Sequence, residues 1–165
     1  MSLSLSTLCQ RCGLCCDGNL FSSLLLRRSE VESMQRLSLP VVDRADGTPG
    51  LEQRCAALDG RCCTVYAERP EACRRYRCYL LTALSEGELT LEEGLAVVDE
   101  AHARINAVEA VLPPERASFP RAVLQRARKE DLPENGGPLP SQTHEIWDRA
   151  ESYLDRHFRG RHRRT

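Results

Sequence analysis

The distribution of cysteine constrains this chain more than any other feature. Nine cysteines occur in 165 residues, and all of them lie within the first 78 positions. They are Cys9, Cys12, Cys15, Cys16, Cys55, Cys62, Cys63, Cys73 and Cys78. In a reducing compartment clustered cysteines favour metal sites over disulfides, and an odd number of cysteines would leave one thiol unpaired. The sequence therefore predicts a first half that is organised around bound metal.

The sequence predicts neither a targeting segment nor a membrane span. Residues 1–10 lack a basic stretch followed by an apolar run, and the longest strongly apolar run, residues 24–26, is far too short to cross a bilayer. The net charge of −1 gives no general attraction to nucleic acid or to anionic membranes. We therefore expect a cytoplasmic protein whose partners are metal ions, and neither a membrane nor a nucleic acid.

The first cysteine group has the spacing of a chelating turn. A C-x2-C pair closes a chelate ring because both sulfurs reach one ion from a tight turn, and Gly13 supplies the backbone freedom for it. Here the pair extends to C-x2-C-x2-C-C over residues 9–16. Consecutive side chains such as Cys15 and Cys16 diverge, so they would serve two centres, or one would bridge two metals. Eight sulfurs fit two four-thiolate sites or one bridged binuclear site.

Six arginines accompany the later cysteines. They are Arg54, Arg61, Arg69, Arg74, Arg75 and Arg77. Eight thiolates and two divalent ions would leave a charge of about −4, which arginine N–H groups can offset by donating to sulfur. A solvated arginine face is an equally good interpretation of the sequence alone.

Strand and turn signals predict an α+β fold for the first half. Residues 20–26 have the composition of a short strand. A hairpin is expected to join residues 51–55 to residues 62–66 through a Leu-Asp-Gly turn. It would bring Cys55 close to the cysteine pair at positions 62 and 63.

Short helices are expected beside these strands. Ser29 and Glu32 have the spacing of a capping box, which predicts a helix start. Pro70 suits the first turn of another helix, with Cys73 and Cys78 on it or just beyond it.

The second half is predicted to be helical. Thr90 and Glu93 form a capping box ahead of an apolar stripe that continues to Leu112. Two further helices are expected, over residues 119–129 and around residues 146–158.

We therefore expect two parts in a small α+β fold. Residues 1–84 would be a metal-stabilised cysteine-cluster domain with a hairpin, short strands and helices, and residues 85–165 a helical extension with a basic C-terminal tail. Residues 40–64 have little apolar content, so metal binding should supply much of their folding free energy, on the order of 10 kcal/mol per structural zinc site.

The strings CQRCGLCC (residues 9–16) and CAALDGRCCTVYAERPEACRRYRC (residues 55–78) resemble the YkgJ-like cysteine-cluster family of zinc- or iron-chelating domains. That family's pattern opens with C-x2-C-x2-C-C and ends with C-x-[IV]-Y-x-x-R-P-x-x-C-R-x-x-x-C. Cys62 stands where the pattern asks for no cysteine, although spacing alone does not separate it from Cys63. The resemblance therefore implies a metal site made of Cys9, Cys12, Cys15, Cys16, Cys55, Cys63, Cys73 and Cys78.

The metal is left open between zinc or iron ions and a [4Fe–4S] cluster. Cys9, Cys12 and Cys15 reproduce the first three positions of a bacterial ferredoxin run, but Cys16 follows at once, so a cluster would need its fourth thiolate from elsewhere, such as Cys78. Flagellin lysine N-methylases are similar across this domain, which implies an iron–sulfur redox or protein-modification factor as an alternative.

No catalytic motif accompanies the cysteines. His144 and Glu145 begin an H-E-x-x-H pattern, but Asp148 takes the place of the second histidine. His102 lies on the stripe of the first long helix, where a packed or hydrogen-bonded role is more common than ligation. The sequence thus predicts a metal-binding protein with a structural or metal-handling role, and it leaves enzymatic activity open, with no recognisable catalytic motif beyond the cysteine cluster. An interaction adaptor that uses the C-terminal helices and basic tail is a further alternative.

Overall fold

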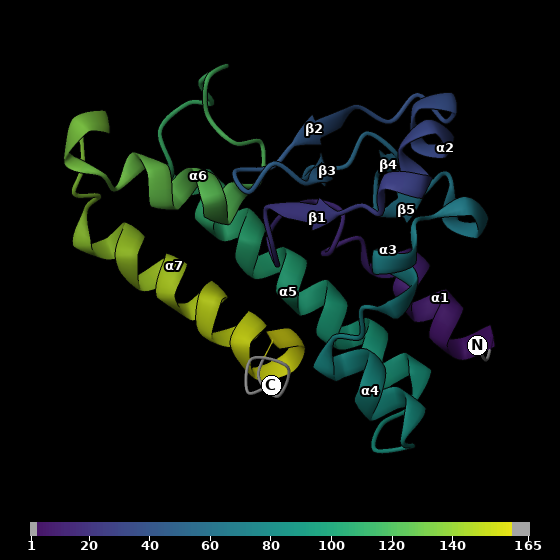
Figure 1. The fold of residues 1–165 in the computed structure, drawn as a ribbon. Helices are drawn as coiled ribbons and strands as arrows, with labels where there is room; N and C mark the ends of the chain where they lie inside the picture. The colour runs from purple at the N-terminus through teal and green to yellow at the C-terminus, as the bar shows by residue number, and fades with distance from the viewer. Residues whose placement is uncertain (1–2, 160–165) are drawn as a thin grey trace.

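The computed structural model describes residues 3–159 and has the α+β architecture that the sequence predicts (Figure 1). The helices are α1 (Leu3–Cys12), α2 (Val31–Arg36), α3 (Glu71–Arg75), α4 (Tyr79–Ser85), α5 (Leu91–Val111), α6 (Val123–Glu130) and α7 (Ser141–Leu154). The strands are β1 (Ser23–Leu25), β2 (Val41–Asp43), β3 (Pro49–Glu52), β4 (Leu58–Asp59) and β5 (Cys62–Cys63). Within residues 3–159 no helix combines the length and apolar character that a membrane span requires.

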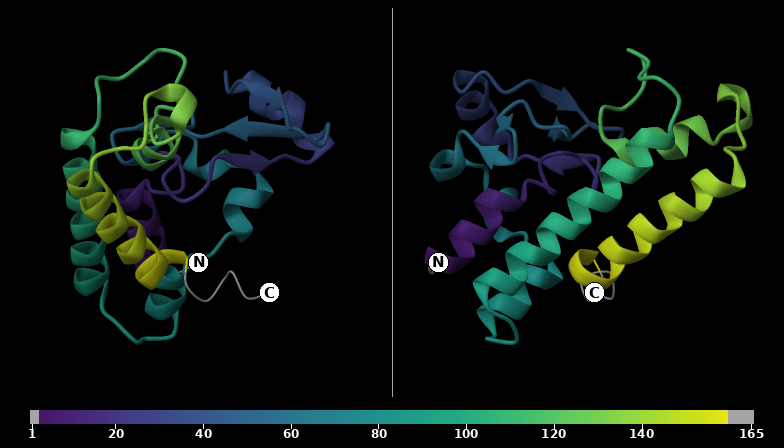
Figure 2. Two further views of the ribbon diagram at one scale, coloured as in Figure 1. Left: turned by 90° about the vertical axis from the view of Figure 1, so that its left-hand side faces the viewer. Right: turned by 180° about the vertical axis from the view of Figure 1, so that it is seen from behind.

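Helix α5 is the axis of the molecule. Its predicted capping box is confirmed, since the Thr90 hydroxyl accepts the Glu93 N–H at 3.2 Å and the Glu93 carboxylate accepts the Thr90 N–H at 2.7 Å. Helices α1, α4, α6 and α7 all contact α5. Helix α7 runs beside it, on the side away from the strands (Figures 1 and 2).

The larger hydrophobic core joins both halves of the chain. Its buried members are Leu5, Leu8, Leu14, Leu80, Leu81, Val98, Ala101, Ile105, Val108, Val123, Leu124, Ala127, Ala150, Leu154 and Phe158. Helices α1 and α4 thus share one core with α5, α6 and α7. The division into residues 1–84 and 85–165 stays a prediction, as does a partner-binding role for the C-terminal helices.

A smaller core lies under a three-stranded antiparallel sheet of order β1-β3-β2. Its buried members are Leu24, Leu26, Met34, Leu39, Leu51 and Ala57. Leu51 of β3 is opposite Leu24 of β1 and Val41 of β2. The strand predicted within residues 20–26 is confirmed as β1.

The predicted hairpin is wrong in its first strand, because Leu58 and Asp59, which were expected in the turn, form β4 themselves. The hairpin consists of β4 and β5, with Leu58 opposite Cys63 and a left-handed Gly60 (φ +55°) in the turn. Residues 49–52 pair instead with β1 and β2, because this register buries Leu51, which is only 3% exposed.

Two predicted helix starts also differ from the structure. The first capping contact joins the Arg27 N–H to the Glu30 carboxylate at 3.0 Å, two residues ahead of the predicted box. Helix α6 begins at Val123 rather than near residue 119, because the N–H of Leu124 donates to the side-chain oxygen of Asn19 at 3.0 Å. This cap comes from 105 residues away, so no local pattern could have revealed it.

Candidate metal centre

Helix α1 presents the first two cysteines. Cys9 and Cys12 lie on this helix, which the sequence analysis interpreted only as a chelating turn. Its buried residues, Leu5 and Leu8, pack in the larger core, and Cys12 packs against that core. The spacing of three and four between Leu5, Leu8 and Cys12 is helical and could have revealed α1.

A tight turn then presents Cys15 and Cys16. Gly13 has φ +70°, and its carbonyl accepts the N–H groups of Cys16 and Asp17, both at 2.9 Å. A Cβ atom on Gly13 would lie 2.9 Å from the carbonyl oxygen of Arg61. Glycine is therefore required here both for the backbone conformation and for close packing against the β4–β5 hairpin.

Four further cysteines come from the following segments. The N–H of Cys55 donates to the Cys16 carbonyl at 2.7 Å, which ties the two segments together. Cys63 lies on β5 and Cys73 on α3. Cys78 is the N-cap of α4, where its sulfur accepts the Leu81 N–H at 3.4 Å.

Eight of the nine cysteines line two adjoining cavities between the two hydrophobic cores. The core-side cavity, about 50 Å³ in volume, is lined by Cys9, Cys12, Cys15, Cys16 and Cys78, with apolar side chains such as Leu8 and Phe158. The sheet-side cavity, about 70 Å³ in volume, is lined by Cys9, Cys15, Cys16, Cys55, Cys63 and Cys73. All nine cysteines are free thiols, and Cys62 is exposed to solvent.

Electrostatic interactions divide these thiols into two groups. Burial raises the pKa of Cys15, and the neighbouring Cys78 and Cys12 raise it further. Burial likewise raises the pKa of Cys16, followed by the effects of Cys55, Cys63 and Cys73. Cys15 is thus affected most by Cys78 and Cys12, and Cys16 by Cys55, Cys63 and Cys73, while Cys16 also raises the pKa of Cys15.

Cys9 interacts with both groups. Burial raises the pKa of Cys12 and raises that of Cys73 to about 12, and Cys9 makes a smaller contribution in the same direction to both. Burial is also the main cause that raises the pKa of Cys78 to about 11. Cys12, Cys73 and Cys78 are therefore protonated at neutral pH when no metal is bound, and a metal ion would have to displace these protons.

The donor set suits zinc or iron, although the sulfurs are not in coordination geometry. Within residues 3–159 no three histidine, cysteine, aspartate or glutamate side chains already surround a point where a metal ion could bind. The two cavities nevertheless gather eight thiols from separate segments, and thiolates accept both zinc and iron. Binding would thus require rotation of cysteine side chains around the cavities.

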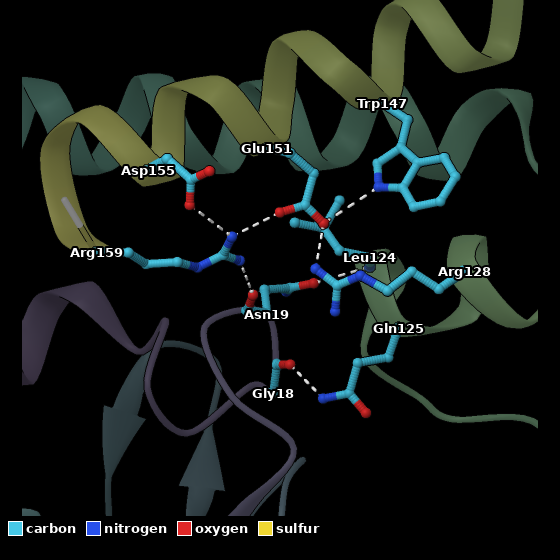
Figure 3. Close-up of polar contacts among 9 residues, drawn as sticks. All are labelled: Gly18, Asn19, Leu124, Gln125, Arg128, Trp147, Glu151, Asp155 and Arg159. Carbon is cyan, nitrogen blue, oxygen red and sulfur yellow. Dashed lines mark hydrogen bonds and ion pairs between the residues drawn. The ribbon is translucent and has the colours of Figure 1, made fainter. Parts of the chain in front are cut away.

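The helical extension holds the loop that follows the cysteine turn (Figure 3). The Asn19 carbonyl accepts a hydrogen bond from Arg159 at 2.6 Å, and the Gly18 carbonyl accepts one from the Gln125 side chain. Arg159, only 6% exposed, also pairs with Glu151 at 2.6 Å. Residues 160–164 of the predicted basic tail lie outside the described residues, while Arg159, the first residue of that tail, is buried.

The two histidine positions considered in the sequence have other partners. His102 on α5 is hydrogen-bonded through Nε2 to the Cys12 carbonyl at 2.7 Å, so it supports α1 from outside the cavities. His144 lies 2.8 Å from a carboxylate oxygen of Asp131.

The sequence of this chain matches the CxxCxxCC family model, described as "Putative zinc- or iron-chelating domain", over residues 8–96. This stretch contains every cysteine and more than half of the chain. The chain belongs to the CxxCxxCC family. Membership confirms the resemblance noted in the sequence and supports metal binding in general. The match ends at residue 96, within α5; Asp99 and His102, which contact Arg61 and the Cys12 carbonyl, lie just beyond it. No curated protein and no solved structure matches the chain.

Proposed function

We propose that this CxxCxxCC protein binds zinc or iron through eight cysteine thiolates and has a structural or metal-handling role. The ligands would be Cys9, Cys12, Cys15, Cys16, Cys55, Cys63, Cys73 and Cys78. The observation that carries the proposal is the convergence of these eight side chains on two adjoining cavities, while Cys62 is exposed.

The thiols would act as two sets of four. The core-side set would be Cys9, Cys12, Cys15 and Cys78, and the sheet-side set would be Cys16, Cys55, Cys63 and Cys73. The electrostatic grouping supports this division, since Cys15 interacts with Cys78 and Cys12, whereas Cys16 interacts with the sheet-side thiols. Cys9, Cys15 and Cys16 line both cavities, so each is a candidate for a bridging sulfur.

Four thiolates around one ion complete a tetrahedral site and leave no open position for a substrate. This favours a structural or metal-handling role over catalysis. When bound, each ion would cross-link separate segments of the chain. The core-side ion would join α1 to α4, and the sheet-side ion would join the cysteine turn to the hairpin and α3.

Elemental analysis of protein purified without oxygen and without a metal-affinity tag tests this function. We expect about two metal ions per chain. Cys12→Ala and Cys73→Ala, one from each set, should each lower the content by about one ion. A wild-type protein with no stoichiometric metal would contradict the proposal, and loss of both ions from Cys9→Ala alone would favour the bridged form.

A [4Fe–4S] cluster in the core-side set is the second candidate. Its support is that Cys78 lines the same cavity as the ferredoxin-like triplet Cys9, Cys12 and Cys15 and so offers the fourth thiolate. Iron with inorganic sulfide and a broad visible absorption in anaerobic protein would favour the cluster, and with it a redox or modification role. A colourless protein with stoichiometric zinc would exclude it.

A further inference from the structure

Arg69 differs from the other arginines near the cysteines. Of the six arginines in residues 54–77, Arg54, Arg61, Arg74, Arg75 and Arg77 are exposed, and Arg69 is the one that is partly buried. Arg61 also reaches the sheet-side cavity, but it pairs with Asp99 at 2.6 Å. The interpretation as a solvated arginine face thus fits five of the six arginines, and Arg69 requires another explanation.

The Arg69 side chain is fixed at the wall of the sheet-side cavity. Its guanidinium carbon lies 3.6 Å from the centre of the Tyr66 ring, and Nη1 donates to the Tyr66 carbonyl at 3.2 Å. Its Nε is buried and has no hydrogen-bond partner within residues 3–159. No ion pair with a carboxylate involves Arg69 among these residues.

A partly buried guanidinium with no carboxylate partner among residues 3–159 is costly, so a negatively charged group beside it would stabilise it. The groups that it faces are thiols. Cys9 and Cys73 line the same cavity as Arg69. Arg69 therefore stands beside one cysteine of each set.

We propose that Arg69, held by stacking on Tyr66, is the cation that compensates the negative charge of the metal-bound thiolates of Cys9 and Cys73 and donates N–H groups to their sulfurs. This inference rests on the proposed function, because only metal-bound cysteines would carry that charge. Tetrathiolate sites with two divalent ions keep a charge of about −4, and one desolvated guanidinium interacts with it more strongly than a solvated one.

The test compares Zn²⁺ affinity, by competition with a chelator, in the full chain and in matched variants. Arg69→Gln should weaken Zn²⁺ binding by about 10- to 100-fold, the usual effect of removing a group that supports metal ligands. Arg74→Gln removes the same charge from an exposed position beside Cys73 and should change the affinity by less than about threefold. Arg69→Lys keeps the charge and should stay within about tenfold of wild type.

A second readout separates this role from a purely structural one. In the Co²⁺-loaded protein, Arg69→Gln should shift the thiolate charge-transfer absorption, because hydrogen bonds to sulfur are lost, whereas Arg74→Gln should leave the spectrum unchanged. Equal Zn²⁺ affinity in wild type and Arg69→Gln would overturn the inference, as would equal losses in Arg69→Gln and Arg74→Gln.

The experiment distinguishes a variant that does not fold from a protein that does not bind metal. If Arg69→Gln does not fold, Arg69→Lys decides: a folded lysine variant with affinity lowered more than about tenfold would overturn the charge role. A wild-type chain that binds no Zn²⁺ and no Co²⁺ would refute the proposed function itself.

Discussion

At the residue scale, glycine and cysteine positions carry most of what the sequence could reveal about the site. The need for glycine at position 13 follows from the cysteine spacing, and its left-handed conformation confirms it. The close approach of Arg61 could not be foreseen, because it depends on how the β4–β5 hairpin packs against the turn. Exposure distinguishes Cys62 from Cys63, which spacing could not do.

Gly13→Ala should destabilise the protein and weaken metal binding. Alanine at φ +70° costs about 1–2 kcal/mol, and its Cβ would clash with the Arg61 backbone. Chemical denaturation and metal content measure both effects. Gly60→Ala is the control, since Gly60 has φ +55° but no heavy atom within 4 Å of the added Cβ. Equal destabilisation by the two variants would mean that the contact with Arg61 is unimportant.

Cys62→Ser and Cys63→Ser should differ sharply in metal content. Cys62 is exposed, whereas Cys63 lines the sheet-side cavity. We expect Cys62→Ser to retain all of its metal and Cys63→Ser to lose about one ion per chain, as measured by elemental analysis. If the Cys62 variant lost metal and the Cys63 variant retained it, Cys62 would be the ligand and Cys63 the spare thiol.

At the element scale, features set by residues a few positions apart were predictable from the sequence. Features set by contacts between distant segments were not. The capping box of α5 and the strand β1 follow from neighbouring residues. The pairing of β3 depends on burial of Leu51 between two other strands, so a local turn signal led to the wrong hairpin partner. Helix α6 starts where Asn19 caps it, and α7 ends in the turn that carries Arg159.

Removal of the Arg159 side chain should loosen the loop of residues 17–20. Arg159→Met would break a buried ion pair with Glu151 and the hydrogen bond to Asn19, at a cost of about 3 kcal/mol. Thermal unfolding measures the loss. Arg149→Met, at an exposed pair with Glu145, should change stability by less than about 0.5 kcal/mol. Similar unfolding temperatures for both variants would contradict the role assigned to Arg159.

At the scale of the whole molecule, the cysteines occupy the boundary between two hydrophobic cores. Cys12 and Cys78 pack against the larger core, and Cys55, Cys63 and Cys73 pack against the smaller one. The sequence predicted a metal-organised first half, but it could not show that α1 and α4 share a core with the C-terminal helices. That association depends on apolar faces from distant segments.

Removal of metal should therefore affect the two cores unequally. The smaller core has six buried members, and the strands above it are three or four residues long, so we expect residues 49–78 to lose amide protection after chelation. Helices α5, α6 and α7 should stay protected, because the larger core holds them without metal. Hydrogen exchange before and after chelation checks this, and uniform protection in both states would refute a structural role for the metal.

The contacts of Gly18 and Asn19 can form only late in the synthesis of the chain. The partners of these two residues, Leu124, Gln125 and Arg159, are translated long after the last cysteine at position 78. A nascent chain thus exposes its complete set of thiols while the segment next to Cys16 still lacks its anchors. Native metal affinity should be reached only once residue 159 has left the ribosome, and until then the thiols would be open to exchange and oxidation.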